Sequence, residues 1–266
     1  MILIRACSGF DELEACVQME IETWGYDLND VLPRKAFTLM QKIGGQVIGA
    51  FDTEIAGGGP KSLVGFALSL PGMKNSERGP RAYLHSHMLA VREGYRNRGL
   101  GARLKLEQRR EALARGIRHM EWTFDPLEIK NAYLNLHKLG AIVRRYETNF
   151  YGASSSRLQA GLPTDRLVAE WELDSPRVEA ALEGRAAEVH EIQARITVPA
   201  SISARRASEA ERERALIVQS ENRRKFQAAF SHGLAVVGFT RDAEGNGIYE
   251  LGPLLQSDAN LEFQGK

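Results

Sequence analysis

A glycine-rich turn, placed between an apolar segment and a helix-forming segment, is the most chemically specific feature of the sequence. Its residues are Arg96, Asn97, Arg98, Gly99, Leu100, Gly101 and Ala102. Because glycine has no side chain, backbone N–H groups at positions 99 and 101 can approach a ligand closely. A helix that begins at Leu100 adds unpaired N–H donors and the positive end of its dipole. The turn is therefore suited to an anion such as phosphate.

Positive charge is concentrated around this turn. Between Arg92 and Arg118 the sequence holds nine basic and three acidic residues, although the whole chain has a net charge of only +1. That concentration favours a small ligand with several phosphates. The sequence contains neither a P-loop motif nor the spaced glycines of the dinucleotide fingerprint, so those two nucleotide sites are excluded. A tight strand-to-helix turn beside a solvated basic helix face remains the alternative interpretation.

Two histidines precede the turn on a predicted strand, residues 82–91. A period of two places His85, His87, Leu89 and Val91 on one face of that strand. Imidazole accepts a proton near neutral pH with little tuning, so His87, and after it His85, are candidates for a general base. Two histidines packed under the sheet are an equally good interpretation. No third ligand with suitable spacing accompanies the pair, and no metal site is predicted.

The segment Leu89–Leu104 resembles the acyl-CoA-binding motif of the GNAT superfamily of N-acyltransferases. That motif, Gln/Arg-x-x-Gly-x-Gly/Ala after a strand, is matched by Arg96, Gly99 and Gly101. The resemblance implies that residues 96–102 hold the pyrophosphate of CoA through main-chain amides. It also implies a bulge in the preceding strand, with Leu89 and Val91 supplying amides beside the thioester and the pantetheine arm. The implied donor is acetyl-CoA or succinyl-CoA, and no metal is required.

A second resemblance lies at residues 136–141, which are similar to the Tyr-x-Lys-x-Gly-Phe end of the next helix in this family. Leu136 stands where many members carry a tyrosine that acts as general acid, so the group that protonates the leaving thiolate is unassigned. Its candidates are Tyr133, His137, Tyr146 and Tyr151. Tyr133 and His137 are four residues apart and share one helix face. Asn135 is a candidate for contact with pantetheine, or else a solvent-facing polar residue.

The acceptor side is less specific. Arg144 and Arg145 could bind a carboxylate bidentately, as an amino acid or a succinyl group would require, or could form a solvated strand end. His85 and Tyr146 are further candidates for substrate binding. In the family's fold, Glu20 and Glu22 would face the acceptor, and surface charge is the alternative interpretation.

These residues need a scaffold, and the order of elements predicts an α/β (α+β) fold. We expect a GNAT-like, mixed and mostly antiparallel central sheet flanked by helices over residues 1–175, followed by a smaller C-terminal α+β extension over residues 176–266. The expected strands of the first part are residues 2–4, 46–51, 62–70, 82–91, 120–124, 141–145 and 167–173. Its expected helices are residues 8–23, 33–44, 100–114 and 125–139, the last with a capping box at Asp125–Glu128. In the extension we expect a helix over 208–230 and a hairpin of strands 234–240 and 247–251, and residues 260–265 resemble a protease-site remnant.

Composition restricts the remaining possibilities. The chain has 266 residues, of which 43% are hydrophobic and 26% charged, which is typical of a globular protein. No apolar run approaches the roughly 20 residues that span a bilayer, and the N-terminus does not resemble a signal peptide. Two cysteines are too few for a disulfide scaffold. We therefore expect a cytoplasmic protein that binds neither nucleic acid nor membrane, and a homodimer formed through the extension stays open.

The expected function is that of a CoA-dependent N-acyltransferase. It would move an acetyl or succinyl group from acyl-CoA to a small amine, such as an amino acid, by direct transfer in a ternary complex. The alternative is an acyl-CoA-binding regulatory protein without turnover, which the leucine at position 136 and the long C-terminal extension favour.

Overall fold

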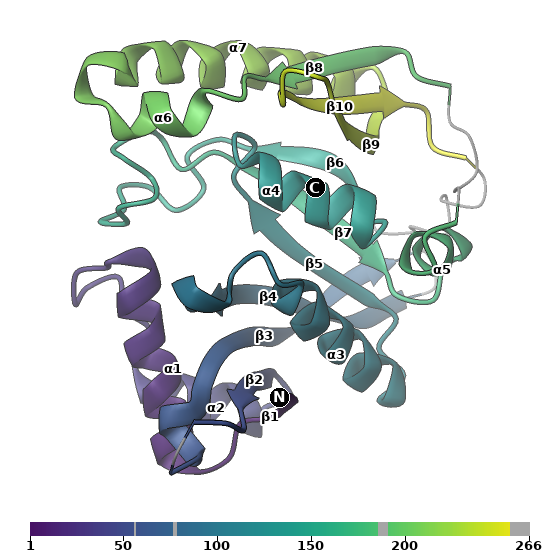
Figure 1. The fold of residues 1–266 in the computed structure, drawn as a ribbon. Coiled ribbons are helices and arrows are strands. Elements are labelled where there is room, and N and C mark those ends of the chain that lie inside the picture. Colours follow the sequence, from purple (N-terminus) through teal and green to yellow (C-terminus); the bar gives the residue numbers. More distant parts are fainter. Residues whose placement is uncertain (56, 77–78, 186–190, 256–266) are drawn as a thin grey trace. The chain divides into compact units, whose positions relative to one another are not determined.

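The structure, a computed structural model, describes residues 1–55, 57–76, 79–185 and 191–255 (Figure 1). Its described part divides into two compact units. The first comprises Met1–Met120 with Ser154–Leu158, and the second comprises Glu121–Ala153 with the chain from Gln159 onward. The domain boundary expected near residue 175 lies inside the second unit, and the expected protease-site remnant at 260–265 lies outside the described residues.

The first unit contains an antiparallel sheet in the order β1–β2–β3–β4. Its strands are β1 (Ile2–Ala6), β2 (Gln46–Asp52), β3 (Leu63–Ser76) and β4 (Gly79–Val91). Its helices are α1 (Gly9–Trp24), α2 (Arg34–Lys42) and α3 (Leu100–Ala114). The last two strands extend beyond their predicted ends because they pair with each other along a long two-stranded ribbon.

Alternation along these strands separates two cores in the first unit. On one face, Val47 and Phe66 pack with side chains of α1 and α2, such as Met19. On the other face, Ile48 packs with Leu104 of α3. Neighbouring residues of β2 thus point to opposite sides, as the two-residue period of a strand requires. Helix α3 is therefore fixed by its apolar side, and its first turn lies at the end of β4.

The second unit continues with six strands in the order β5–β7–β6–β9–β10–β8. They are β5 (His119–Phe124, whose first two residues belong to the first unit), β6 (Ile142–Glu147), β7 (Arg166–Glu172), β8 (Ala194–Val198), β9 (Ala235–Arg241) and β10 (Gly247–Gly252). The helices are α4 (Ile129–Ala132), α5 (Pro176–Leu182), α6 (Ile202–Ala207) and α7 (Arg212–Ser231). Since β9 pairs with β6, the C-terminal hairpin of β9 and β10 extends the same sheet.

Aromatic side chains fill the core of the second unit. Trp122 and Trp171 are buried and meet edge to face, with ring centroids 5.7 Å apart. Tyr249 lies between Phe226 of α7 and Phe239 of β9. In Figure 1 helix α7 runs alongside the C-terminal strands, and its buried side supplies Phe226. The predicted fold class, a mixed and mostly antiparallel sheet flanked by helices, is confirmed.

Two predicted helix starts are wrong. The helix expected from Asp125 begins at Ile129, because the Asp125 carboxylate accepts a hydrogen bond from the Leu127 N–H at 2.8 Å and closes a turn instead of capping a helix. That helix then continues as a π-helix over Tyr133–Lys138, in which the Leu139 N–H bonds to the Leu134 carbonyl. The helix expected over 208–230 begins at Arg212, after a 3₁₀ turn at Glu209–Glu211, and Ser208 makes no side-chain cap.

Candidate functional site

The glycine-rich turn leads directly into the first turn of α3. Asn97 and Gly99 adopt positive φ angles of 61° and 73°, and α3 begins directly after Gly99. The first hydrogen bond of this helix runs from the Arg103 N–H to the Gly99 carbonyl at 3.1 Å. The N–H groups of Leu100, Gly101 and Ala102 are therefore helix-start donors without an intrahelical acceptor. Within the described ranges, nothing lies within 4 Å of the position that a Cβ would take at Gly99. The turn therefore has the geometry that close approach of an anion needs.

Side chains hold the turn in place. The Arg96 Nε donates to the Val91 carbonyl at 3.0 Å, which joins the turn to the end of β4. The Arg98 guanidinium lies 5.6 Å from the Tyr95 ring, and the Tyr95 hydroxyl donates to Asp52 on β2 at 2.7 Å. Leu100 is buried below the turn. Arg96, Asn97 and Arg98 are exposed and Ala102 is half-buried, so cationic side chains surround the helix start.

One basic residue of this region lies inside the protein. Lys105 is buried, its Nζ donates to the Ser86 Oγ at 2.8 Å, and burial holds its pKa well below the usual range. The Ser86 Oγ donates in turn to Gln108 Oε1 at 2.9 Å. Lys105 therefore joins α3 to β4 and contributes nothing to the surface charge that the sequence suggested.

A β-bulge interrupts β4 where the histidines lie. Leu68 of β3 pairs with Met88, whereas the next residue, Ser69, pairs with Ser86, so His87 occupies the bulge. A bulge disrupts the ladder locally and changes the direction of side chains and amides. The irregularity agrees with the bulge that the family resemblance implies, two residues before Leu89.

The predicted alternation of β4 is confirmed. Leu84, Ser86, Met88 and Ala90 are buried, and His85, His87, Leu89 and Val91 are partly exposed. Burial, together with His85, whose ring centroid lies 6.2 Å away, lowers the pKa of His87 to about 4. The His87 imidazole is therefore neutral at pH 7 but a weaker base than a free histidine. No group of three or more metal-ligating side chains occurs in the described part of the chain.

The candidates for the general acid differ in their surroundings. The Tyr133 ring stacks on His137 at 4.5 Å and lies 5.1 Å below the Arg241 guanidinium of β9, so both of these candidates pack with the C-terminal strands. The Tyr146 hydroxyl donates to Asp165 at 2.6 Å, and burial, with this hydrogen bond, raises the pKa of Tyr146 above its usual range. Asn135 on the same π-helix is buried, which excludes the solvent-facing alternative.

Tyr151 is the most accessible of these phenols. Its side chain is 44% exposed, and its hydroxyl shares a hydrogen bond of 3.0 Å with the Thr123 Oγ1 at the end of β5. The Tyr151 N–H donates to Thr164 Oγ1 at 2.9 Å, and the Arg166 guanidinium lies 5.4 Å from the ring. Hydrogen bonds at both its backbone and its hydroxyl thus fix this residue.

The two arginines of β6 already bind carboxylates of the chain. Arg144 pairs with Glu170, and Arg145 pairs with Glu121 at 2.7 Å and with Glu170 at 3.2 Å. Both glutamates are buried. A substrate carboxylate would therefore compete with these internal ion pairs.

Glu20 is a titratable residue whose burial the sequence analysis missed. It is fully buried on α1, its Oε1 accepts from the Leu32 N–H at 3.0 Å, and within the described ranges its Oε2 has no hydrogen-bond partner. Burial raises its pKa to about 7. Glu20 follows the apolar Cys16 by four residues and Val17 by three, which places it on the apolar side of the helix. This spacing is the sequence signal that predicts its burial.

Comparisons with known proteins give a family match and similar folds. Residues 14–140 match the model of the Acetyltransferase (GNAT) family. The chain is similar to the crystal structure of Arabidopsis thaliana NAA60 in complex with acetyl-CoA, with 18% identity and a TM-score of 0.53 over 64% of this chain and 98% of that one. The ribosomal-protein-S18-alanine N-acetyltransferase of Escherichia coli is similar at 16% identity and a TM-score of 0.49, over 65% and 94% of the two chains. No curated protein sequence matches the chain.

Within residues 1–55, 57–76, 79–185 and 191–255, no helix is long and apolar enough to cross a membrane.

Proposed function

Because residues 14–140 of the chain belong to the GNAT acetyltransferase family, we propose that this acyl-CoA-dependent N-acyltransferase moves an acetyl group to the amino group of a small amine, such as an amino acid. Direct transfer in a ternary complex needs no metal. Succinyl-CoA is a second proposed donor. The observation that carries the proposal is the exposed helix start after Gly99, whose N–H groups fit a diphosphate.

Each part of the proposed reaction has a candidate group. Amides at the helix start after Gly99 hold the CoA pyrophosphate, whereas the Arg96 N–H of the expected loop 96–102 already donates to the Glu93 carbonyl at 3.1 Å. The β4 amides near Leu89 and Val91 face the thioester. The amine nitrogen attacks the thioester carbonyl carbon, the C–N bond forms, and the C–S bond breaks. The amine loses its proton to a base, for which His87 is the candidate, and the departing sulfur takes a proton from an acid.

Binding supplies most of the expected acceleration. Holding two reactants in line is worth roughly 7–11 kcal/mol, and one oriented donor to the oxyanion about 3–4 kcal/mol. A general base or acid adds typically about 10²–10⁴-fold. A weak base such as His87 is therefore compatible with turnover, because an amine that arrives unprotonated needs only to lose a proton after attack.

For the acid we propose Tyr151. Its hydroxyl is hydrogen-bonded to Thr123 and its side chain is 44% exposed, whereas the Tyr133 ring is enclosed by Arg241 and His137. Tyr146 is less suited to act as the acid, since its hydroxyl already donates a hydrogen bond to Asp165.

A pair of glycine variants tests the diphosphate site. Gly99 and Gly116 flank α3 with φ angles of 73° and 74°, and within the described residues neither has an atom within 4 Å of a would-be Cβ. Gly99→Val and Gly116→Val should therefore destabilise the fold by similar amounts. Only Gly99→Val should weaken CoA binding, by at least about tenfold in titration calorimetry, because it obstructs the amides. Equal affinities of the two variants, or no binding of CoA to the wild type at millimolar concentration, would refute the diphosphate site.

Turnover is tested by thiol release. Acetyl-CoA and succinyl-CoA are each incubated with a panel of amino acids and other small amines, and free thiol is measured. Release above the amine-free background supports the proposed acceptor class and identifies the donor. Tight CoA binding without release from any amine would favour the non-catalytic alternative, for which Leu136 argues.

A further inference from the structure

A buried carboxylate joins the C-terminal helix to the loop that carries Tyr151. Asp165, directly before β7, is fully buried and accepts hydrogen bonds from the Tyr146 hydroxyl at 2.6 Å, the Asn149 N–H at 3.0 Å and the Arg223 guanidinium at 2.8 Å. Burying a carboxylate is costly unless it is paired and hydrogen-bonded, so these four residues act as a unit. We call them the Asp165 clamp. Arg223 is the member that belongs to α7.

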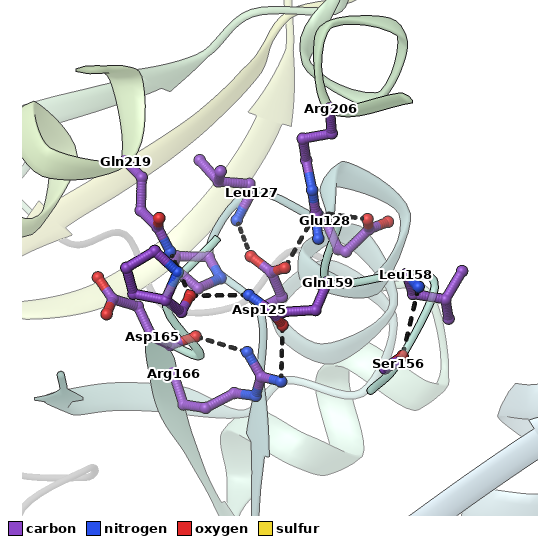
Figure 2. A network of polar contacts seen from close by, with 12 residues as sticks. Asp125, Leu127, Glu128, Ser156, Leu158, Gln159, Asp165, Arg166, Arg206 and Gln219 are labelled. Atoms are coloured by element: carbon purple, nitrogen blue, oxygen red, sulfur yellow. Dashed lines mark hydrogen bonds and ion pairs between the residues drawn. The ribbon is translucent and has the colours of Figure 1, made fainter. Parts of the chain in front are cut away.

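A second attachment lies two residues before Asp165. The Pro163 carbonyl accepts from Gln159 Nε2 at 2.7 Å and from Gln219 Nε2 of α7 at 2.9 Å (Figure 2). Figure 2 also shows Arg166 bound to the Gln159 side chain and to the Asp165 carbonyl. Helix α7 therefore holds the end of the loop at residues 163 and 165, on both sides of Thr164.

Thr164 transmits this attachment to Tyr151. It is 1% exposed, and its Oγ1 accepts from the Tyr151 N–H at 2.9 Å and lies 3.1 Å from the Gly152 carbonyl. Its own N–H donates to Asn149 Oδ1 at 3.1 Å, and its carbonyl accepts from the Phe150 N–H at 3.0 Å. Residues 150–152 are thus bonded to Thr164 through their backbone and Asn149 through its side chain, while the Tyr151 hydroxyl shares a hydrogen bond with Thr123.

We propose that α7 is a positioning element for proton donation, and that Arg223 is the positioning residue through which it acts on the Tyr151 phenol. This inference rests on the proposed function, in which Tyr151 protonates the leaving sulfur. In that step the phenol O–H bond breaks and an S–H bond forms, and the resulting phenolate takes a proton from water, which its partial exposure allows. Because a displacement of about 1 Å can cost roughly 10²-fold in rate, loosening the loop should slow this step.

Matched arginines on α7 allow a clean test. Arg223→Ala removes the positive charge from the Asp165 clamp. Arg223→Lys keeps that charge but removes the planar set of guanidinium N–H donors. Arg224→Ala removes the exposed arginine next to Arg223 and serves as the control. For each variant kcat, the KM values for acetyl-CoA and amine, and amide hydrogen exchange at Asn149 and Tyr151 are measured. We expect Arg223→Ala to lower kcat about tenfold or more, to leave the acetyl-CoA KM within about twofold, and to accelerate exchange at both amides at least about tenfold. Arg223→Lys should be intermediate and Arg224→Ala unchanged.

Other outcomes overturn the inference. If Arg223→Ala matches Arg224→Ala in kcat and in exchange, the clamp does not position the loop. If it weakens acetyl-CoA binding as much as it lowers kcat, its role is general stability. Should Arg223→Ala not fold, the same comparisons apply to Arg223→Lys. A wild-type protein that releases no thiol refutes the proposed function instead, and the exchange measurement then still decides whether the clamp holds the loop.

Discussion

At the scale of single residues, Glu20 shows how burial alone sets a charge state. Its side chain on α1 is fully buried, and its pKa is raised to about 7 by loss of water, against one opposing hydrogen bond from the Leu32 N–H. In the unfolded chain the same group titrates near 4.5. Between these values the folded protein retains a proton that the unfolded chain has lost. Stability therefore falls as pH rises through this window, and the full penalty is present above about pH 7.

Replacing Glu20 by glutamine should remove this penalty. Glu20→Gln keeps the hydrogen bond from Leu32, so we expect it to raise the free energy of unfolding at pH 8 by up to about 3 kcal/mol and to change it little at pH 4. Urea unfolding at the two pH values measures the difference, with the half-exposed Glu14→Gln as control. A variant that is less stable than the wild type at pH 8 would contradict this account.

His87 gives a second prediction of pH dependence. Burial, together with His85, depresses its pKa from 6.5 to about 4, so the unfolded chain takes up a proton before the folded protein does. His87 thus contributes stability above pH 6.5 that is lost as pH falls toward 4. NMR titration should place the His87 midpoint near 4, and a pH–rate profile should lack a His87 limb near 6.5. A midpoint close to 6.5 would disprove the assigned environment.

At the scale of elements, α6 fixes the start of the helix that follows β5. The buried Arg206 of α6 reaches Asp125 at 3.0 Å and Glu128 at 2.9 Å (Figure 2). Burial, with Asp125 nearby, still raises the pKa of Glu128, which shows that this guanidinium only partly offsets the lost water. Removing the Arg206 guanidinium would leave the carboxylates of Asp125 and Glu128 close together without the cation that pairs with both.

Arg206→Ala should therefore destabilise the second unit. Breaking a buried ion pair costs about 3–5 kcal/mol, and the partial exposure of Glu128 lowers our expectation to about 2–4 kcal/mol. Denaturant unfolding compares this variant with Arg205→Ala, a neighbour on the same short helix, for which we expect less than about 0.5 kcal/mol. Equal losses would show that Arg206 stabilises only through general packing.

Local signals explain which elements could be predicted. The glycine-rich turn and α3 follow from glycines that need positive φ angles and from an apolar helix face, so the observed bounds of α3 equal the predicted ones. The predicted helix start at Asp125 is wrong because an aspartate can close a turn as well as cap a helix. Which of the two forms depends on Arg206, which lies 81 residues later and pairs with Asp125. The pairing of Arg145 with Glu121 and the clamp at Asp165 depend on strand neighbours that no local pattern specifies.

At the scale of the whole molecule, the C-terminal third completes the second unit. β9 pairs with β6, and Phe226 of α7 stacks on Tyr146 at 5.7 Å. Without these elements, β6 would present an open edge and an apolar face to water. We therefore propose that residues 176–255 of the extension are required for folding, even though their sequence pattern differs from that of the first 175 residues.

Truncation tests this dependence. A chain of residues 1–175 should be insoluble, or should unfold without a cooperative transition, whereas a chain of residues 1–255 should unfold like the full-length protein. Calorimetry and size-exclusion chromatography measure both. A soluble, cooperative 1–175 chain with full CoA affinity would instead establish an independent N-terminal domain.

The edge-to-face pair of Trp122 and Trp171 gives the second unit its own optical reporter. Of the three tryptophans in the chain, only Trp24 belongs to the first unit, where it stacks on Tyr26. In a Trp24→Phe background, the remaining indole emission and its near-ultraviolet circular dichroism would therefore follow the second unit alone. Unfolding of one half of the protein could then be observed separately from the other, without an attached dye.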